Sequence, residues 1–220
     1  SQGRLPASER DALTNARAAM EALGNELEDP VTGEPVVPLL HVYDPRAWNG
    51  EGAVAIAYGD PDTADNVTTM VPGTTVKGES IPGDSGHARR VYESARLADP
   101  YSTTATIMWI GYDTPEFTDG TVASQSMATA GGERLADYVD GLNAARRGSD
   151  VHMSVIGHSY GSTTVGISAT ENGLDVDDVI LVGSPGAGRG TDHADDLGGP
   201  TVWVGNASRD PVAVLGDNGW

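Results

Sequence analysis

The chain has 220 residues, of which 38% are apolar, and it carries a formal net charge of −19 at pH 7. This length and apolar content suffice for one domain with a sizeable hydrophobic core. No stretch approaches the roughly 18 consecutive apolar residues of a membrane-spanning helix, so we expect a soluble globular protein. Because no cluster of Lys and Arg accompanies the negative charge, the composition excludes nucleic acid as a partner and disfavours anionic membrane surfaces.

The sequence contains no cysteine. Its absence excludes thiol catalysis, thiolate metal sites and disulfide bonds, and it leaves a cytoplasmic or a secreted location open. We expect no metal ion or other cofactor. The acidic segment 60–65 resembles a calcium-binding loop only in part, because its third carboxylate comes one position late and no glycine follows where that loop requires one. We interpret it as an acidic turn.

The first predicted element is an amphipathic helix within residues 1–28. Ser8 begins a segment with the spacing of a capping box, and apolar residues then recur at steps of three and four. This apolar stripe is expected to pack on the rest of the chain or on a preceding helical region. The chain begins with serine and shows no signal peptide, so we expect a processed product or part of a longer protein. The stripe consists of Leu13, Ala16, Met20, Leu23 and Leu27.

Residues 36–220 form the second predicted domain. Three short β-like segments in quick succession favour a hairpin that leads into a sheet, and strands then alternate with helices. Such alternation implies parallel strand–helix–strand units with helices on both faces of the sheet. The predicted strands are 39–43, 53–58, 67–71, 106–110, 151–156, 179–182 and 201–204, and the predicted helices are 87–98, 126–147 and 162–169.

The strand at 151–156 runs directly into Gly157-His158-Ser159-Tyr160-Gly161, which has the pattern G-x-S-x-G. A serine used as a nucleophile must stand clear of its own backbone, and a sharp turn from strand to helix achieves this. The turn strains the backbone and leaves little room, so glycine fits on either side. The strand–turn–helix context favours a nucleophilic Ser159. The alternative is an ordinary glycine-rich turn in which Ser159 caps the following helix.

Acyl transfer by serine also requires hydrogen-bond donors for the oxyanion and an acid that orients a histidine base. The backbone amides of Tyr160, directly after Ser159, and of Thr74, in the loop after the third strand, are the candidate donors. Asp210 lies just beyond the last predicted strand, at the sheet edge where functional groups gather, and is the candidate acid. Its rivals are Asp192, Asp195 and Asp196 on a glycine-rich loop.

The base is the missing part of this arrangement. The chain has five histidines, and none of them follows Asp210. Only His193 is expected on a loop at the correct end of the sheet. A simpler explanation is that the base belongs to a strand and loop beyond Trp220, or that a second chain completes the site. The histidines are His41, His87, His152, His158 and His193.

From about Asp29 to its end, the sequence resembles a bacterial family of α/β-hydrolases of largely undetermined function. The resemblance implies the α/β-hydrolase fold, with a mostly parallel sheet, helices on both faces, a minimal cap and the last strand absent from this chain. It also implies a helical region before Asp29, Ser159 as nucleophile, Asp210 as acid and a histidine beyond Trp220. The matching motifs are Tyr43-Asp44-Pro45, the segment 59–66, Val71-Pro72-Gly73-Thr74, the segment 157–162, Val182-Gly183-Ser184-Pro185-Gly186 and Asp210-Pro211-Val212.

The expected function is that of a serine hydrolase of the esterase or lipase type, acting on a small-molecule ester or a lipid-like substrate through an acyl-enzyme. The segment 184–200 is too short for a large lid, so we expect an open site. Tyr112, Asp113 and Phe117 are expected in the pocket wall. Two alternatives stay open: a catalytically silent binding module with the same fold, and an acyltransferase that uses the same nucleophile.

Overall fold

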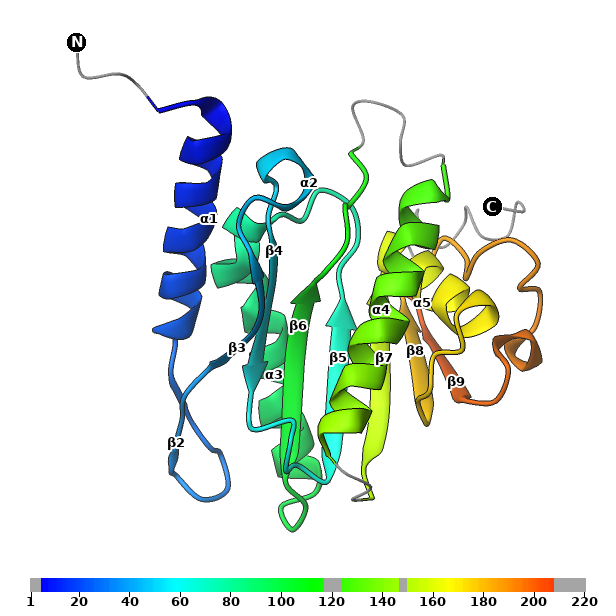
Figure 1. Ribbon diagram of the computed structural model, residues 1–220. Coiled ribbons are helices and arrows are strands. Elements are labelled where there is room, and N and C mark those ends of the chain that lie inside the picture. The colour runs from blue at the N-terminus through cyan, green and yellow to red at the C-terminus, as the bar shows by residue number, and fades with distance from the viewer. Residues whose placement is uncertain (1–4, 117–123, 147–149, 208–220) are drawn as a thin grey trace.

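The computed structural model describes residues 5–116, 124–146 and 150–207. Within these ranges a seven-stranded sheet forms the centre of the molecule, in the order β3-β4-β6-β5-β7-β8-β9 (Figure 1). The strands are β3 (Leu39–Asp44), β4 (Ala53–Tyr58), β5 (Asn66–Val71), β6 (Thr104–Ile110), β7 (His152–His158), β8 (Asp178–Val182) and β9 (Thr201–Gly205).

The sheet is antiparallel at one side and parallel over the rest. Strands β3 and β4 form the expected hairpin, and β4 also runs antiparallel to β6. From β6 onward through β5, β7, β8 and β9 every pairing is parallel. The carboxyl ends of these parallel strands therefore lie along one edge of the sheet, which is where ligands bind in open α/β sheets.

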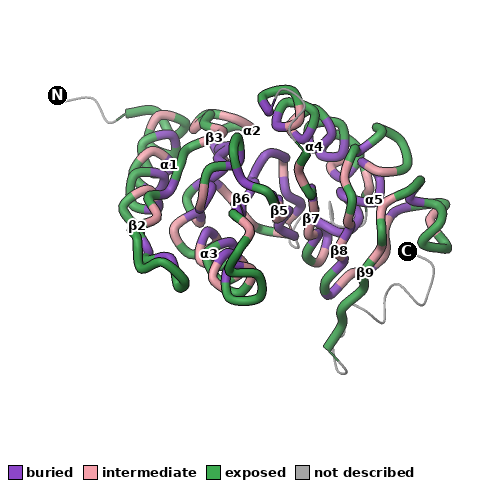
Figure 2. The backbone as a smooth tube through the Cα atoms, turned by 90° about the horizontal axis from the view of Figure 1, so that it is seen from below, coloured by how far each residue is buried: buried purple, intermediate pink, exposed green. Residues whose placement is uncertain are grey.

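Helices lie on both faces of the sheet, as predicted (Figure 2). Helix α3 (Ile81–Ala98) covers β4 and β6 on one face, and α1 (Ala7–Leu23) packs against α3. Helices α4 (Ser126–Ala145) and α5 (Tyr160–Glu171) cover the other face. The remaining elements are the short helix α2 (Ala47–Gly50), the 3₁₀ helices η1 (Gly78–Ser80) and η3 (Ala194–Leu197), and the paired strands β1 (Leu27–Glu28) and β2 (Pro35–Val36).

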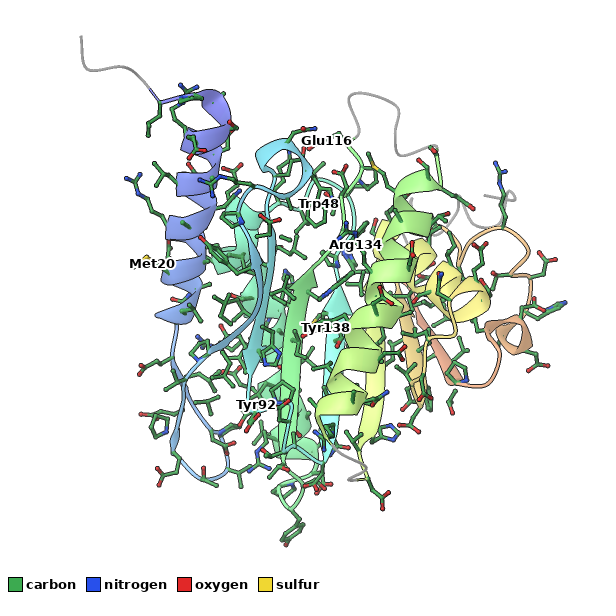
Figure 3. The ribbon with its side chains drawn as sticks, viewed as in Figure 1. Met20, Trp48, Tyr92, Glu116, Arg134 and Tyr138 are labelled. Atoms are coloured by element: carbon green, nitrogen blue, oxygen red, sulfur yellow. The ribbon has the colours of Figure 1, made fainter. Side chains whose placement is uncertain are left out.

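The predicted details of the first helix are partly wrong. The N-cap position of α1 is Pro6, where no side chain caps the helix, and residues 27–28 form a strand instead of extending the helix. Leu13 is 45% exposed and Met20 is 74% exposed, and Met20 points away from the sheet in Figure 3. The buried face consists mainly of small residues, which let the helix approach α3 closely. These residues are Ala12, Asn15, Ala18, Ala19 and Ala22.

The connection between β8 and β9 contains only η3, within the residues described, so the edge that holds the site is not covered by a lid domain there. None of the described helices has the length and hydropathy needed to cross a membrane. The predictions that concern Asp210 and the end of the chain lie outside the described residues.

Candidate active site

Ser159 occupies the turn between strand β7 and helix α5. Its backbone has φ 54° and ψ −128°, a conformation that residues other than glycine rarely adopt. It stands at the N-cap position of α5, yet its side chain makes no capping hydrogen bond. The interpretation of Ser159 as a simple helix cap is therefore wrong, and its hydroxyl is not used by the helix.

The glycines on either side of Ser159 are required by close backbone contacts. A Cβ atom on Gly157 would lie 2.7 Å from the Cα of Ser162, and one on Gly161 would lie 2.4 Å from the carbonyl oxygen of Val71. Real Cβ atoms do not approach other atoms so closely. The G-x-S-x-G spacing thus follows from the steric demands of the turn.

The loop after β5 lies directly against Ser159. A Cβ atom on Gly73 would lie 2.8 Å from the Cβ of Ser159 and 3.2 Å from its Oγ. Within the described part of the chain, the N–H groups of Thr74 and Tyr160 have no hydrogen-bond acceptor. Tyr160 begins α5, where the first backbone N–H groups have no partner inside the helix. We name residues 72–77 the oxyanion loop.

A cavity of about 410 Å³ opens at Ser159 and the oxyanion loop. Its volume lies within the range of small-molecule sites, and its wall is mostly apolar. The cavity lies between α3 and the adjacent face of β5, β6, β7 and β8. It is lined by Met70, Val71, Pro72, Gly73, Thr74, Val76, Asp84, His87, Val91, Met108, Ile156, His158, Ser159 and Val182.

Two of the three residues predicted for the pocket wall, Tyr112 and Asp113, are absent from this lining. Tyr112 is 1% exposed, and its hydroxyl donates a hydrogen bond of 2.6 Å to the carbonyl oxygen of Pro72. Asp113 is half-buried and does not line the cavity. Phe117 lies outside the described residues. The chain turns into the core after β6, so Tyr112 lies beneath the oxyanion loop and not in the cavity wall.

His193 does not reach Ser159. Its backbone N–H donates to the Asp196 carboxylate at 2.8 Å, which closes the first turn of η3. The same carboxylate accepts the N–H of Asp192, and these two hydrogen bonds lower the pKa of Asp196. Neither the rival acids of this loop nor His193 line the cavity. Asp210 lies outside the described residues.

Two histidines that the sequence analysis set aside do line the cavity, His87 and His158. The Nδ1 of His87 is 3.0 Å from Nη2 of Arg90. Because a guanidinium only donates hydrogen bonds, this nitrogen must be the acceptor, and a neutral His87 carries its proton on Nε2. His87 can thus donate to a bound molecule through Nε2. Its spacing from Asp84, one helical turn earlier on α3, was the available sequence signal.

The hydroxyl of Ser159 has no side-chain partner among the described residues. The other histidines lie elsewhere: His152 bonds to Asp178 at the opposite ends of β7 and β8, and burial lowers the pKa of His41, on β3. Across the described ranges, no three His, Asp or Glu side chains gather closely enough to hold a metal ion.

Two solved structures align with most of this chain. A carboxylesterase from Bacillus cereus aligns over 76% of this chain and 80% of its own with a TM-score of 0.51 and 15% identity. A dienelactone hydrolase from Anabaena variabilis aligns over 82% of this chain and 79% of its own with a TM-score of 0.46 and 16% identity. At 15% identity, the likeness to the carboxylesterase concerns the fold alone.

Sequence comparison identifies relatives and the family. An uncharacterised protein of Mycobacterium tuberculosis is 41% identical over 196 residues, which is 87% of this chain and 30% of that protein. An uncharacterised protein of Mycobacterium bovis is 31% identical over 199 residues, 87% of this chain and 70% of that protein. The chain thus spans less than a third of the length of the first relative. A family model described as "Alpha/beta hydrolase" matches residues 44–217, and the chain belongs to this family.

Proposed function

We propose that the chain is a serine hydrolase that cleaves carboxylic esters through an acyl-enzyme formed on Ser159. The observation that carries the proposal is the strained backbone of Ser159, whose hydroxyl does not cap the helix. Beside it, the backbone N–H groups of Thr74 and Tyr160 have no acceptor among the described residues. Strain of this kind costs on the order of 1–3 kcal/mol and is found mainly at functional sites. Family membership and the cavity at Ser159 support the same conclusion.

In the proposed reaction, Ser159 Oγ attacks the ester carbonyl carbon while a histidine takes the hydroxyl proton. The amides of Tyr160 and Thr74 donate to the oxyanion of the tetrahedral intermediate. The carbon–oxygen bond to the alcohol then breaks, and the alcohol leaves with the proton from the histidine. A water molecule hydrolyses the acyl-enzyme by the same steps. The assignment of Asp210 as the acid, and of a base from beyond Trp220 or from a second chain, stays a prediction.

The composition of the cavity wall favours an ester with an apolar acyl group. Its apolar lining includes Met70, Met108 and Ile156 from the strands and Val91 from α3. Each CH₂ group transferred from water to such a surface contributes about 0.8 kcal/mol to binding. The polar groups of Asp84 and His87 at the α3 rim are available to the carbonyl or alcohol side of the substrate.

A fluorophosphonate probe tests the proposal, because it phosphonylates only an activated serine. Intact mass and peptide mapping should find one adduct, on the peptide that contains Ser159. The Ser159→Ala variant should take up none, whereas Ser154→Ala, on the same strand, should react like the wild type. Absence of any adduct, both in this chain and in a form extended beyond Trp220, would exclude the hydrolase and favour the catalytically silent binding module.

A further inference from the structure

The segment 112–116, which follows β6, contacts the oxyanion loop through four of its five residues. Tyr112 bonds to the start of the oxyanion loop. Glu116 lies beside the end of the loop, near α2 (Figure 3). The two segments are joined by Tyr112 Oη to Pro72 O at 2.6 Å, Thr75 N to Pro115 O at 3.1 Å, Thr114 Oγ1 to Val76 O at 2.8 Å, and Lys77 Nζ to Glu116 Oε1 at 2.7 Å.

We infer that Tyr112 is a positioning residue for the oxyanion loop: by holding the Pro72 carbonyl, it aims the peptide groups that receive the oxyanion beside Ser159. The inference rests on the proposed function, and it changes the predicted role of Tyr112 from contact with substrate to control of the loop that contacts substrate.

The ring of Tyr112 is fixed from several sides. It stacks on Trp109 with ring centroids 6.2 Å apart and an angle of 14° between the planes. Gly131 of α4 packs so tightly on the ring that a Cβ atom there would lie 2.9 Å from it, and an equal distance from the Thr164 methyl group of α5. These contacts hold the ring in place and so fix the direction in which its hydroxyl points. Burial raises the pKa of Tyr112, so the hydroxyl keeps its proton and donates a hydrogen bond.

Peptide geometry carries this constraint to the site. A trans peptide is planar, and its N–H points opposite to its C=O. Fixing the Pro72 carbonyl therefore fixes the direction of the Gly73 N–H, and with it the start of the Gly73–Thr74 peptide. The Pro72 carbonyl is also enclosed on its other side, because a Cβ atom on Gly161 would lie 2.6 Å from its oxygen.

The end of the loop is held in a comparable way. Thr75 has φ 63°, which is strained for a β-branched residue, and its N–H bonds to Pro115. Lys77 bridges Glu116 and Glu51, at 2.7 and 3.2 Å. The hydrogen bond to Glu116 and then the one to Glu51 raise the pKa of Lys77 against the opposing effect of partial burial. The loop is thus held at both ends while Thr74 faces the cavity.

Tyr138 of α4 provides a matched control. It also packs on Trp109, with centroids 6.0 Å apart, and burial raises its pKa as well. Its hydroxyl, however, has no hydrogen-bond partner among the described residues. Substituting Phe at either position removes one buried hydroxyl from the same aromatic cluster, but only Tyr112→Phe removes a hydrogen bond to the oxyanion loop.

The experiment compares Tyr112→Phe, Tyr138→Phe and the wild type by ester hydrolysis, fluorophosphonate labelling rate and NMR amide exchange. For p-nitrophenyl butyrate, Tyr112→Phe should lower kcat on the order of tenfold with little change in KM, which is less than the loss of an entire oxyanion donor. It should slow labelling by a similar factor and accelerate exchange of the Thr75 amide. Tyr138→Phe should match the wild type in all three.

Two results would overturn the inference. The first is equal kcat and labelling rate in Tyr112→Phe and Tyr138→Phe when the wild type is active. The second is an unchanged Thr75 exchange rate in Tyr112→Phe, which decides the question even if no form hydrolyses the ester. If neither this chain nor a form extended beyond Trp220 turns over ester or accepts the probe, the proposed function is contradicted instead, and the amide exchange then still distinguishes a held loop from a free one.

Discussion

The two faces of the sheet differ sharply over β7 and β8. On the face toward α4 and α5, Val155 and Val179 are at most 1% exposed. On the face toward α3, the strand register aligns Met70, Ile156, Ile180 and Trp203 in one row across four strands. The first three of these are only half-buried, and Trp203 is 58% exposed.

This difference shows where the stability and the site of the molecule lie. Strands of parallel sheets are usually covered on both faces, and β4 and β6 are buried at every position. Over β7 and β8 the described residues cover one face only. The cavity at Ser159 lies at the boundary, where α3 ends its cover and the sheet becomes open. We therefore expect substitutions on the α4 and α5 face to act on stability, and those at the boundary to act on binding.

The largest effect is expected from Gly166→Ala in α5. A Cβ atom there would lie 1.9 Å from the carbonyl oxygen of Ala187, which is a backbone clash that no side-chain movement relieves. We expect the free energy of unfolding to fall by at least about 3 kcal/mol, as measured by urea denaturation.

Gly141→Ala in α4 is the matched control, because an added Cβ meets nothing within 4 Å there. It should stabilise the protein by roughly 0.5–1 kcal/mol through higher helix propensity. Equal stability of the two variants would contradict the description of the α5 face as tightly closed.

The next largest effect concerns the covered half of the α3 face, where Asp29 meets Arg96 and Tyr92. The Asp29 carboxylate accepts hydrogen bonds of 2.7 Å from both side chains, and it is 6% exposed. Asp29→Asn would leave the buried guanidinium without its counter-ion, so we expect a loss of about 3 kcal/mol in the free energy of unfolding. Glu9→Gln breaks the exposed ion pair with Arg46 and should leave thermal unfolding nearly unchanged.

The same network predicts a pH dependence. Burial alone would raise the pKa of Asp29, but the hydrogen bonds from Arg96, Tyr92 and two backbone amides lower it well below its usual 3.8. Its stabilising contribution is therefore present above about pH 4 and is lost as the pH falls further. Burial and then Asp29 raise the pKa of Tyr92 from 10.0 to about 12. The stabilising contribution of the neutral Tyr92 hydroxyl is therefore present below about pH 10 and is lost as the pH rises through 12. A stability profile of Asp29→Asn that keeps the wild-type acid slope would refute this.

The smallest effects compare adjacent positions on β8. Val179 is fully buried under α5, whereas Ile180 points to the open face. Val179→Ala should cost about 2 kcal/mol, and Ile180→Ala should cost no more than about 1 kcal/mol although it removes more atoms. The reverse order in urea denaturation would show that the open face is covered in solution.

The strands, the order of elements and the elbow could be predicted because each depends on local sequence. Alternation of short apolar runs with helices implies a mostly parallel sheet. The turn at Ser159 needs glycine on both sides, and the five residues 157–161 suffice to indicate it. The sequence predicts only the last two thirds of helix α3, because Pro82 and Gly83 in its first turn disguise its start.

The rest depends on contacts between distant residues, for which the sequence has no local signal. The hydrogen bond of Tyr112 joins residues 40 positions apart, and Asp29 and Arg96 are 67 positions apart. Periodicity also predicts the wrong buried face for α1. It favours large apolar side chains such as Met20, whereas the buried face consists mainly of alanines, which pack more closely. His87 was set aside for a similar reason, since its approach to the cavity depends on how α3 lies on the sheet.

The backbone conformation of Ser159 has a practical consequence for the study of ligands. At φ 54° and ψ −128° glycine is the residue of lowest strain, so Ser159→Gly should relax the turn and raise the melting temperature while it removes the hydroxyl. The usual inactive variant, Ser159→Ala, keeps the Cβ atom and hence the strain. Ser159→Gly is therefore the better scaffold for trapping an intact ester in crystals, since it combines loss of the nucleophile with a more robust fold.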